Sequence, residues 1–254
     1  MLLDKLGALR RRFGFRIRRW RSRLIGPENT EGIWNVHGHL SYVDYVELQK
    51  RKTADPTRRS KWLSEEWSPK VHEFETYFRS LFVEIGAHPS VLKLRAETSD
   101  SAISQPGDEY EALAVGARTG QEVQALRNLG WAAIGVDLVP QLPLVIEGDL
   151  HELPFTDNTF NFTFSNVFDH ALNPQKMIQE IERVTIDGGW ICLHLAVGEP
   201  TDEFGVTEIA SVTAGARLFR TSRIVYSGRM DRMLAMNAMI LARKDPDSNW
   251  KPHH

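Results

Sequence analysis

From residue 110 onward the sequence alternates short apolar runs with segments of helical periodicity, and this alternation constrains the fold more than any other feature. Strand, helix and strand at this spacing predict right-handed crossovers between parallel strands, and therefore a parallel sheet covered by helices. We predict strands at residues 112–115, 132–136, 144–146, 160–165 and 190–196, and helices at 121–129, 174–184 and near 210–218.

Two further strands, at 222–227 and 234–242, follow each other with a turn predicted at Ser227 and Gly228. Successive strands joined by a short turn predict an antiparallel hairpin, which we expect to close one edge of the sheet. A second turn, at residues 187–189, is predicted to close the 174–184 helix.

The composition agrees with one sizeable α/β domain, with or without an extension: 254 residues, 42% hydrophobic and 25% charged. The single cysteine, Cys192, excludes an internal disulfide. The sequence contains no run of about eighteen uncharged apolar residues, so we expect no membrane-spanning helix. We therefore expect an intracellular protein, either cytoplasmic or associated with an organelle or membrane.

Residues 28–100 are predicted to be mostly helical and are rich in aromatic side chains. Ser41, followed three residues later by Asp44, is a variant of the capping box that starts a helix. The segment 65–82 places Val71, Phe74, Phe78 and Phe82 on one helical face, which we interpret as core rather than as a cofactor site. Residues 98–109 form a polar loop and a plausible domain boundary.

Residues 1–25 contain nine basic side chains and one acid, a net charge of +8, so the remaining chain carries −10. Apolar residues recur in this arm every three or four positions, which predicts an amphipathic helix. Such a helix binds an anionic membrane surface, acts as a targeting segment, contacts nucleic acid, or docks on the acidic body of its own chain.

Residues 112–120 read as a strand that enters a glycine-containing turn and then a helix. Such a turn lets backbone N–H groups and a helix N-terminus approach a ligand. Seventeen residues past Gly120, the next strand ends in Asp137, where nucleoside-binding α/β folds place an acid that holds the ribose diol. Turn and acid together indicate a nucleoside site.

The run from Glu147 to Asn166 (EGDLHELPFTDNTFNFTFSN) closely resembles the "GDxxxLPFxDxSFDxVxS" stretch of class I S-adenosylmethionine-dependent methyltransferases, in particular the group called type 11. The resemblance continues through residues 167–170, 178–184 and the 187–189 turn. It covers about residues 110–198 strongly and the terminal hairpin loosely, to about residue 242.

The resemblance implies a Rossmann-like class I methyltransferase sheet of seven strands with an antiparallel hairpin at one edge, and S-adenosyl-L-methionine as the cofactor. The implied cofactor-binding residues are the glycine turn, the ribose acid and its neighbour, the adenine-side pair and the strand end beside the methyl group: Gly116, Ala117, Arg118, Thr119, Gly120, Asp137, Leu138, Asp149, Leu150, Asn166 and Val167. Asp169 and His170 are the acid/base pair that the motif places for catalysis.

Two positions depart from the family pattern, which reads acid-x-Gly-x-Gly-x-Gly. Ala114 replaces the acid that helps to hold the ammonium group of the cofactor, and its loss removes roughly 1.5–3 kcal/mol of binding. Arg118 replaces the middle glycine, where we hypothesise that its guanidinium pairs with the carboxylate of the cofactor instead.

We divide the chain into a basic arm (1–26), a helical extension or lid (27–100), the methyltransferase-like domain (101–244) and a tail (245–254). The leading function is methyl transfer to a small molecule; a nucleic-acid substrate is disfavoured because no basic cluster lies near the motifs. The alternatives are a degenerate methyltransferase-like scaffold and, less favoured, a nicotinamide-dependent oxidoreductase.

Three other features are interpreted structurally. His37 and His39 lack a third ligand nearby and are read as loop histidines, so no metal is expected. His194 lies inside a predicted strand and is read as a core histidine with its polar groups satisfied. Tyr42 and Tyr45 on the extension are read as core packing, with capping of the pocket as the alternative.

Deletion of residues 1–25 tests the interpretation of the basic arm. If the arm is an address, the truncated protein moves from the membrane fraction to the soluble fraction after cell lysis and still binds the cofactor, because the arm contributes nothing to the site. Loss of cofactor binding on truncation would instead identify the arm as a helix docked on the body.

Overall fold

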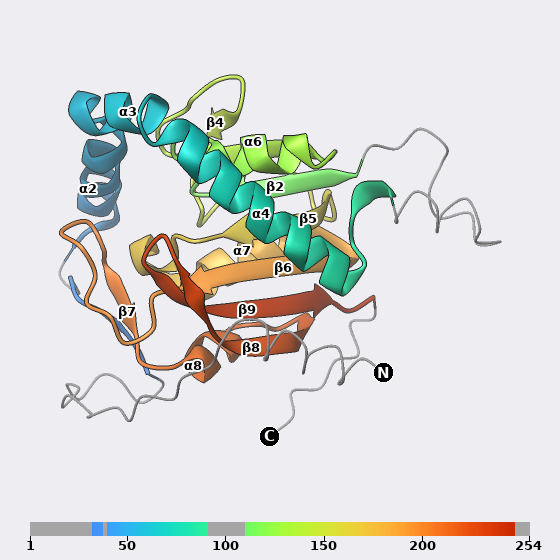
Figure 1. Ribbon diagram of the computed structural model, residues 1–254. Helices are drawn as coiled ribbons and strands as arrows, with labels where there is room; N and C mark the ends of the chain where they lie inside the picture. The colour runs from blue at the N-terminus through green and yellow to red at the C-terminus, as the bar shows by residue number, and fades with distance from the viewer. Residues whose placement is uncertain (1–31, 38–39, 91–109, 247–254) are drawn as a thin grey trace.

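The computed structural model describes residues 32–37, 40–90 and 110–246 (Figure 1). The predicted arm at 1–26, the boundary loop at 98–109, His39 and most of the predicted tail lie outside the described residues. Within the described ranges, no helix combines the length and apolar character that crossing a membrane requires.

A seven-stranded sheet forms the centre of the fold, in the order β4-β3-β2-β5-β6-β9-β8. Its strands are β2 (Glu111–Val115), β3 (Ala132–Asp137), β4 (Val145–Glu147), β5 (Phe160–Ser165), β6 (Thr185–Leu195), β8 (Ser222–Met233) and β9 (Met236–Lys244). The first five strands in that order run parallel, whereas β9 is antiparallel to β6 and to β8. The predicted parallel sheet with an antiparallel hairpin at one edge is confirmed.

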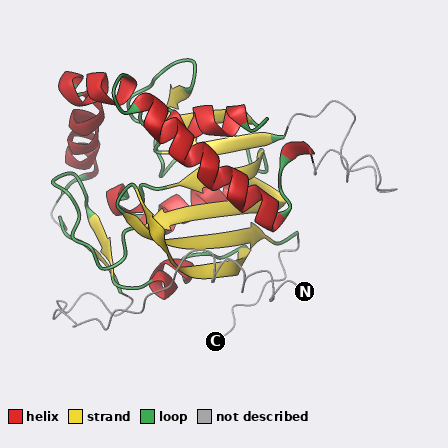
Figure 2. Cartoon of the chain, in the orientation of Figure 1, coloured by secondary structure: helices red, strands yellow, loops and turns green. Residues whose placement is uncertain are grey.

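Helices cover both faces of the sheet (Figure 1; Figure 2). One face packs on α4 (Trp67–Ile85) and α6 (Gln121–Asn128), and the other packs on α7 (Pro174–Val184), with α8 (Val212–Ala216) beside it. In β2 the side chains alternate, since Ala112 and Ala114 face α4 whereas Leu113 and Val115 face α7. A strand buried on both faces is expected in a parallel sheet.

Phenylalanines on α4 form the main contact between the N-terminal extension and the sheet. Phe74, Phe78 and Phe82 stack along the helix with ring centroids 5.8 and 5.9 Å apart. Phe78 meets Phe162 and Phe164 of β5 edge to face at 5.9 and 5.0 Å, a favourable geometry for aromatic pairs. These side chains and Val71 are buried, so the predicted core face is confirmed.

The helix predicted to begin at Ser41 is α2 (Tyr42–Ala54). The Ser41 hydroxyl accepts a hydrogen bond from the Asp44 backbone N–H at 3.2 Å and donates one to the Asp44 carboxylate at 2.6 Å. Asp55 then caps α3 (Pro56–Leu63) through the Arg58 N–H. The local sequence signals therefore define both helix starts.

The extension also contains a strand that helical periodicity does not predict. Strand β1 (Ile33–Asn35) pairs antiparallel with β7 (Thr207–Ile209) in a separate two-stranded sheet. Three residues are too short for a period-2 pattern, and the partner strand lies more than 170 positions away, so no local signal marks this pairing.

Two turn predictions were wrong. The hairpin turns at Leu234 and Ala235, which adopt φ of 51° and 79°, whereas β8 continues through Ser227 and Gly228. Glycine is the usual hairpin signal, but a Cβ on Gly228 would come within 2.8 Å of the Tyr226 hydroxyl, so this glycine serves a close side-chain approach. The 187–189 turn lies inside β6, which begins at Thr185 and bulges between its pairings with Phe160 and Phe162.

Replacement of Phe78 by alanine tests the aromatic contact between α4 and β5. The side chain is fully buried, so Phe78→Ala should lower the free energy of unfolding by about 3–5 kcal/mol in urea denaturation. Val83→Ala on the same helix is the control, because Val83 is 74% exposed and should change stability by less than about 0.5 kcal/mol. Equal effects of the two substitutions would contradict the assignment.

Candidate functional site

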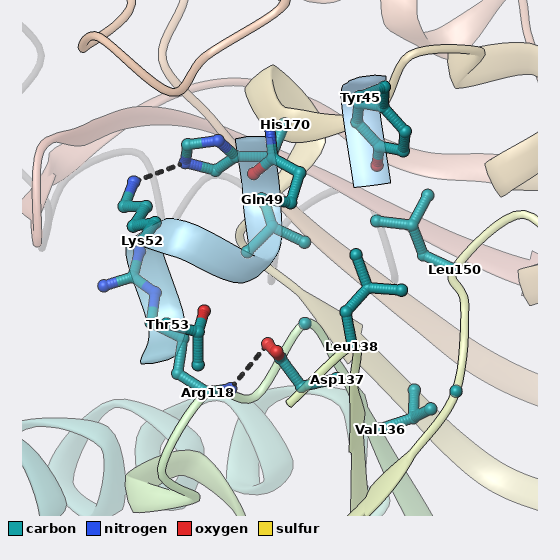
Figure 3. A pocket seen from close by; sticks show the side chains of 13 residues that line it. Tyr45, Gln49, Lys52, Thr53, Arg118, Val136, Asp137, Leu138, Leu150 and His170 are labelled. Atoms are coloured by element: carbon teal, nitrogen blue, oxygen red, sulfur yellow. Dashed lines mark hydrogen bonds between the residues drawn. The ribbon is translucent and has the colours of Figure 1, made fainter. Parts of the chain in front are cut away.

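A cavity of about 50 Å³ opens at the carboxyl ends of the central strands, where β3 and β5 flank β2 on opposite sides. Such a switch point in strand order is where ligands bind in open α/β sheets. The cavity is lined by α2, the glycine turn, the ends of β3 and β5 and the 3₁₀ turn η1 (Phe168–His170): Tyr45, Gln49, Lys52, Thr53, Gly116, Arg118, Val136, Asp137, Leu138, Gly148, Leu150, Val167 and His170 (Figure 3).

The glycine turn is held tightly between neighbouring strands. Gly116 adopts a φ of 76°, and a Cβ there would come within 2.3 Å of Val167, so only glycine fits. Arg118 has a φ of 46°, a left-handed conformation that is unusual for a residue with a side chain. Its backbone N–H donates to the Asp137 carboxylate at 3.0 Å, which joins the turn to the end of β3.

Asp137 presents a carboxylate to the cavity. Besides Arg118, the Val139 backbone N–H donates to it at 3.1 Å. Burial raises the pKa of Asp137 above its usual value, although these two donors lower it. The remaining acceptor positions of this carboxylate are suited to hydroxyl donors such as a ribose diol.

One face of α2 closes the cavity from the extension side. Tyr45, Gln49, Lys52 and Thr53 recur at helical spacing and all line the cavity (Figure 3). Tyr45 is buried, so it belongs both to the core and to the cavity wall. The sequence interpretation missed Gln49, Lys52 and Thr53. The available signal was polar residues four, seven and eight positions along the helix from Tyr45.

Lys52 lies at the centre of a polar cluster. Its ammonium is 2.9 Å from His170 Nε2 and 2.7 Å from the Asp202 carboxylate. Burial and the Arg118 charge lower the pKa of Lys52. Burial would raise the pKa of Asp202, but the hydrogen bond and the charge of Lys52 hold it at about 2. The cluster ties α2 to η1 and to the loop before β7.

His170 has both ring nitrogens engaged in this cluster. Nδ1 is 3.2 Å from the Phe204 carbonyl oxygen, so it carries the proton and donates there, which leaves Nε2 to accept from Lys52. Burial lowers the pKa of His170, as do the charges of Lys52 and Arg118, against the nearby Asp169 carboxylate. The histidine is therefore neutral at neutral pH.

Asp149 does not line the cavity, although its neighbour Leu150 does. Its carboxylate accepts hydrogen bonds from the Tyr42 hydroxyl and from His151 Nδ1, the latter at 2.9 Å. These bonds lower the pKa of Asp149 and outweigh the opposing effect of burial. Tyr42 thereby attaches α2 to the loop after β4.

The other predicted site residues lie around the cavity wall. Ala117 is buried in the core, and Gly120 lies before α6, where a Cβ would meet Leu144 at 2.9 Å. Thr119 and Asn166 line a second cavity, of about 160 Å³, which Arg118 also borders. The Asp169 Oδ1 atom is buried and has no hydrogen-bond partner among the described residues.

Residues 113–193 match the family model of the methyltransferase domain. The fold is similar to that of a Burkholderia thailandensis 1,6-didemethyltoxoflavin-N1-methyltransferase, with a TM-score of 0.58 at 14% identity over 84% of this chain and 95% of that one. A putative sarcosine dimethylglycine methyltransferase from Galdieria sulphuraria aligns with a TM-score of 0.45 at 14% identity, over 54% of this chain and 79% of that one. No curated protein matches the sequence.

His194, predicted to be a satisfied core histidine, is buried in β6 between Tyr77 and Phe164, with ring centroids 4.6 and 4.9 Å away. Its Nε2 has no hydrogen-bond partner among the described residues, so the ring is core but not fully satisfied. Burial lowers its pKa to about 3.

The buried His194 should make the fold sensitive to acid. The unfolded chain binds a proton at this residue near pH 6.5, but the folded protein does so only near pH 3. Between these values the free energy of unfolding should fall by up to about 1.4 kcal/mol per pH unit as the pH decreases. His194→Leu should flatten this slope in urea titrations between pH 4.5 and 6.5, whereas the exposed control His72→Gln should keep it; an unchanged slope in His194→Leu would refute the assignment.

Proposed function

We propose that the chain transfers a methyl group from S-adenosylmethionine to a small molecule, because residues 113–193 match the family model of the methyltransferase domain. The observation that carries the proposal is the cavity at the switch point, where the glycine turn and the Asp137 carboxylate face each other.

The residues present fit the nucleoside half of this cofactor. Asp137 keeps acceptor positions for the two ribose hydroxyls, because its backbone donors use only part of its capacity. Leu138 and Leu150 line the same cavity and provide apolar surfaces for the adenine ring. Asp149 is engaged by Tyr42 and His151, so a contact from it to the adenine amino group requires Tyr42 to move.

The cavity is smaller than the roughly 300–1,000 Å³ typical of small-molecule sites. Lys52 and Arg118 narrow it, and both have long, flexible side chains. We propose that α2 acts as a lid over the site, held closed by the contacts of Lys52 with His170 and of Tyr42 with Asp149. Outward movement of α2 then widens the space to the size of the cofactor.

When bound, the cofactor supplies a methyl group already activated by its sulfonium. The chain contributes alignment of the acceptor and exclusion of water, which are the main requirements of such a transfer. Val167, two residues after the end of β5, fixes the glycine turn through its contact with Gly116. The geometry supports His170 as an anchor for Lys52 more than as a base, because its Nε2 lone pair is directed at the Lys52 ammonium.

The second candidate is a methyltransferase-like protein that binds a ligand without catalysis. Ala114 lacks a carboxylate and Arg118 projects a side chain where the family pattern has glycine, and these two residues favour it. Binding of S-adenosylhomocysteine, the product formed from the cofactor, would show that the site accepts S-adenosylmethionine. A test of methyl transfer itself would also require the acceptor molecule.

Substitution of Asp137 tests the proposed ribose contact. We expect wild-type protein to bind S-adenosylhomocysteine and to be stabilised by about 2.7 kcal/mol at a hundredfold excess over Kd. Asp137→Asn should weaken binding at least about tenfold in calorimetry, because it removes charge-assisted hydrogen bonds. The control Asp231→Asn, exposed on β8, should bind like wild type. Wild-type protein that shows no binding would favour the second candidate.

A further inference from the structure

Two groups of opposite charge, the Arg118 guanidinium and the Glu122 carboxylate, border the second cavity, and neither forms an ion pair among the described residues. This cavity, of about 160 Å³, lies beyond Arg118 from the first, between the glycine turn, α4, α6 and the turn that joins β8 to β9. Its wall is partly apolar, through Trp62, Phe74 and Met236, and it includes the Glu122 carboxylate. Unpaired charges at such a wall require an explanation.

Glu122 lies in the first turn of α6 and is only 8% exposed. Its Oε2 atom is inaccessible to solvent and has no hydrogen-bond partner among the described residues. Burial raises the pKa of Glu122 to about 7, against the lowering effects of Arg118, of Lys70 on α4 and of the Asn166 amide. Lys70 is already paired with Glu66. A buried carboxylate in this state gains from a cationic donor.

Arg118 borders both cavities, and its side chain extends beside Lys52 (Figure 3). Its guanidinium lies 5.4 Å from the centre of the Trp62 ring, a cation–π contact. The part of the chain that the structure describes offers it no ion pair. A guanidinium in this position is suited to bind a carboxylate through two parallel hydrogen bonds.

Glu122 provides, on the same face of the sheet, the negative charge that Ala114 lacks. Ala114 on β2 packs in the core cluster that contains Phe74, and Phe74 also borders the cavity that holds Glu122. S-adenosylmethionine ends in an amino acid group with one ammonium and one carboxylate, and a buried ammonium without a partner is costly.

We propose that Arg118 and Glu122 form a clamp for an α-amino acid zwitterion, in which Arg118 binds the carboxylate and Glu122 binds the ammonium of the methionine end of S-adenosylmethionine. This inference rests on the proposed function. The nucleoside then occupies the first cavity and the amino acid end reaches past Arg118 into the second. In this proposal Arg118, at the position of the middle glycine, and Glu122, in place of the acid missing at position 114, are binding residues.

Calorimetry with two probes tests the clamp. S-adenosylhomocysteine carries the amino acid end, whereas 5′-methylthioadenosine has the same nucleoside without it. Glu122→Gln and Arg118→Met should each weaken S-adenosylhomocysteine about tenfold to a hundredfold and leave 5′-methylthioadenosine unchanged. The matched control is Glu84→Gln, because Glu84 on α4 also has a buried oxygen without a described partner but lies outside both cavities.

A pH titration of the affinity and a double variant distinguish loss of the clamp from misfolding of a single variant. Wild-type affinity for S-adenosylhomocysteine should fall as the pH decreases from 8 to 6, because Glu122 must be ionised to bind the ammonium, and Glu122→Gln should remove this dependence. The double variant with Ala114→Asp and Glu122→Gln should bind S-adenosylhomocysteine more tightly than Glu122→Gln alone, because the acid at position 114 restores a partner for the ammonium.

The outcomes separate the clamp from the function on which it rests. Wild-type affinity of Glu122→Gln for S-adenosylhomocysteine, or an equal loss for both probes, overturns the clamp alone. Binding of 5′-methylthioadenosine without binding of S-adenosylhomocysteine also overturns it, while keeping the nucleoside site. Failure of the wild type to bind either probe overturns the proposed function and the clamp together.

Discussion

The contact between Gly116 and Val167 is the constraint on which the arrangement of the site depends. The Gly116 α-carbon lies so close to the Val167 side chain that a single added carbon would overlap it. This contact brings the end of β2 against the residue that follows β5, at the point where strand order reverses. The Gly116 N–H also donates to the Val136 carbonyl at 2.8 Å, so the same turn is fixed to β3. Three strand ends therefore meet at one glycine, and the cavity lies directly above it.

Structural features that depend on residues close together in the sequence were predictable. Strand and helix periodicity after residue 110, the Ser41 cap and the phenylalanine face of α4 each follow from residues a few positions apart. The approach of α2 to the cavity was not predictable, because Lys52 meets His170 across 118 positions and no local pattern encodes that contact. The same reason hides the pairing of β1 with β7. The position of the hairpin turn was predicted wrongly for a different reason. Leu234 and Ala235 adopt left-handed conformations although neither is a glycine, the residue that usually marks such a turn.

The resemblance to a methyltransferase family predicted where the site residues lie in the sequence, but not which of their side chains line the cavity. It placed Asp149 and Asp137 at the ends of neighbouring strands, yet only Asp137 faces the cavity, because Tyr42 and His151 engage Asp149. It also left out Glu122, whose sequence position in the first turn of a helix suggests an exposed acid that favours the helix dipole. Packing of α4 against α6 buries that carboxylate, and burial gives it a pKa near neutrality.

The backbone at Arg118 bears on the choice between an enzyme and a degenerate fold. A left-handed conformation costs a residue with a side chain about 1–2 kcal/mol relative to glycine, and here the N–H bond to Asp137 holds it in place. The strained turn and the buried Glu122 carboxylate together fit the charged ligand that we propose for this site. Compared with the family pattern, the acid lies at position 122 instead of 114, and an arginine takes the place of the middle glycine.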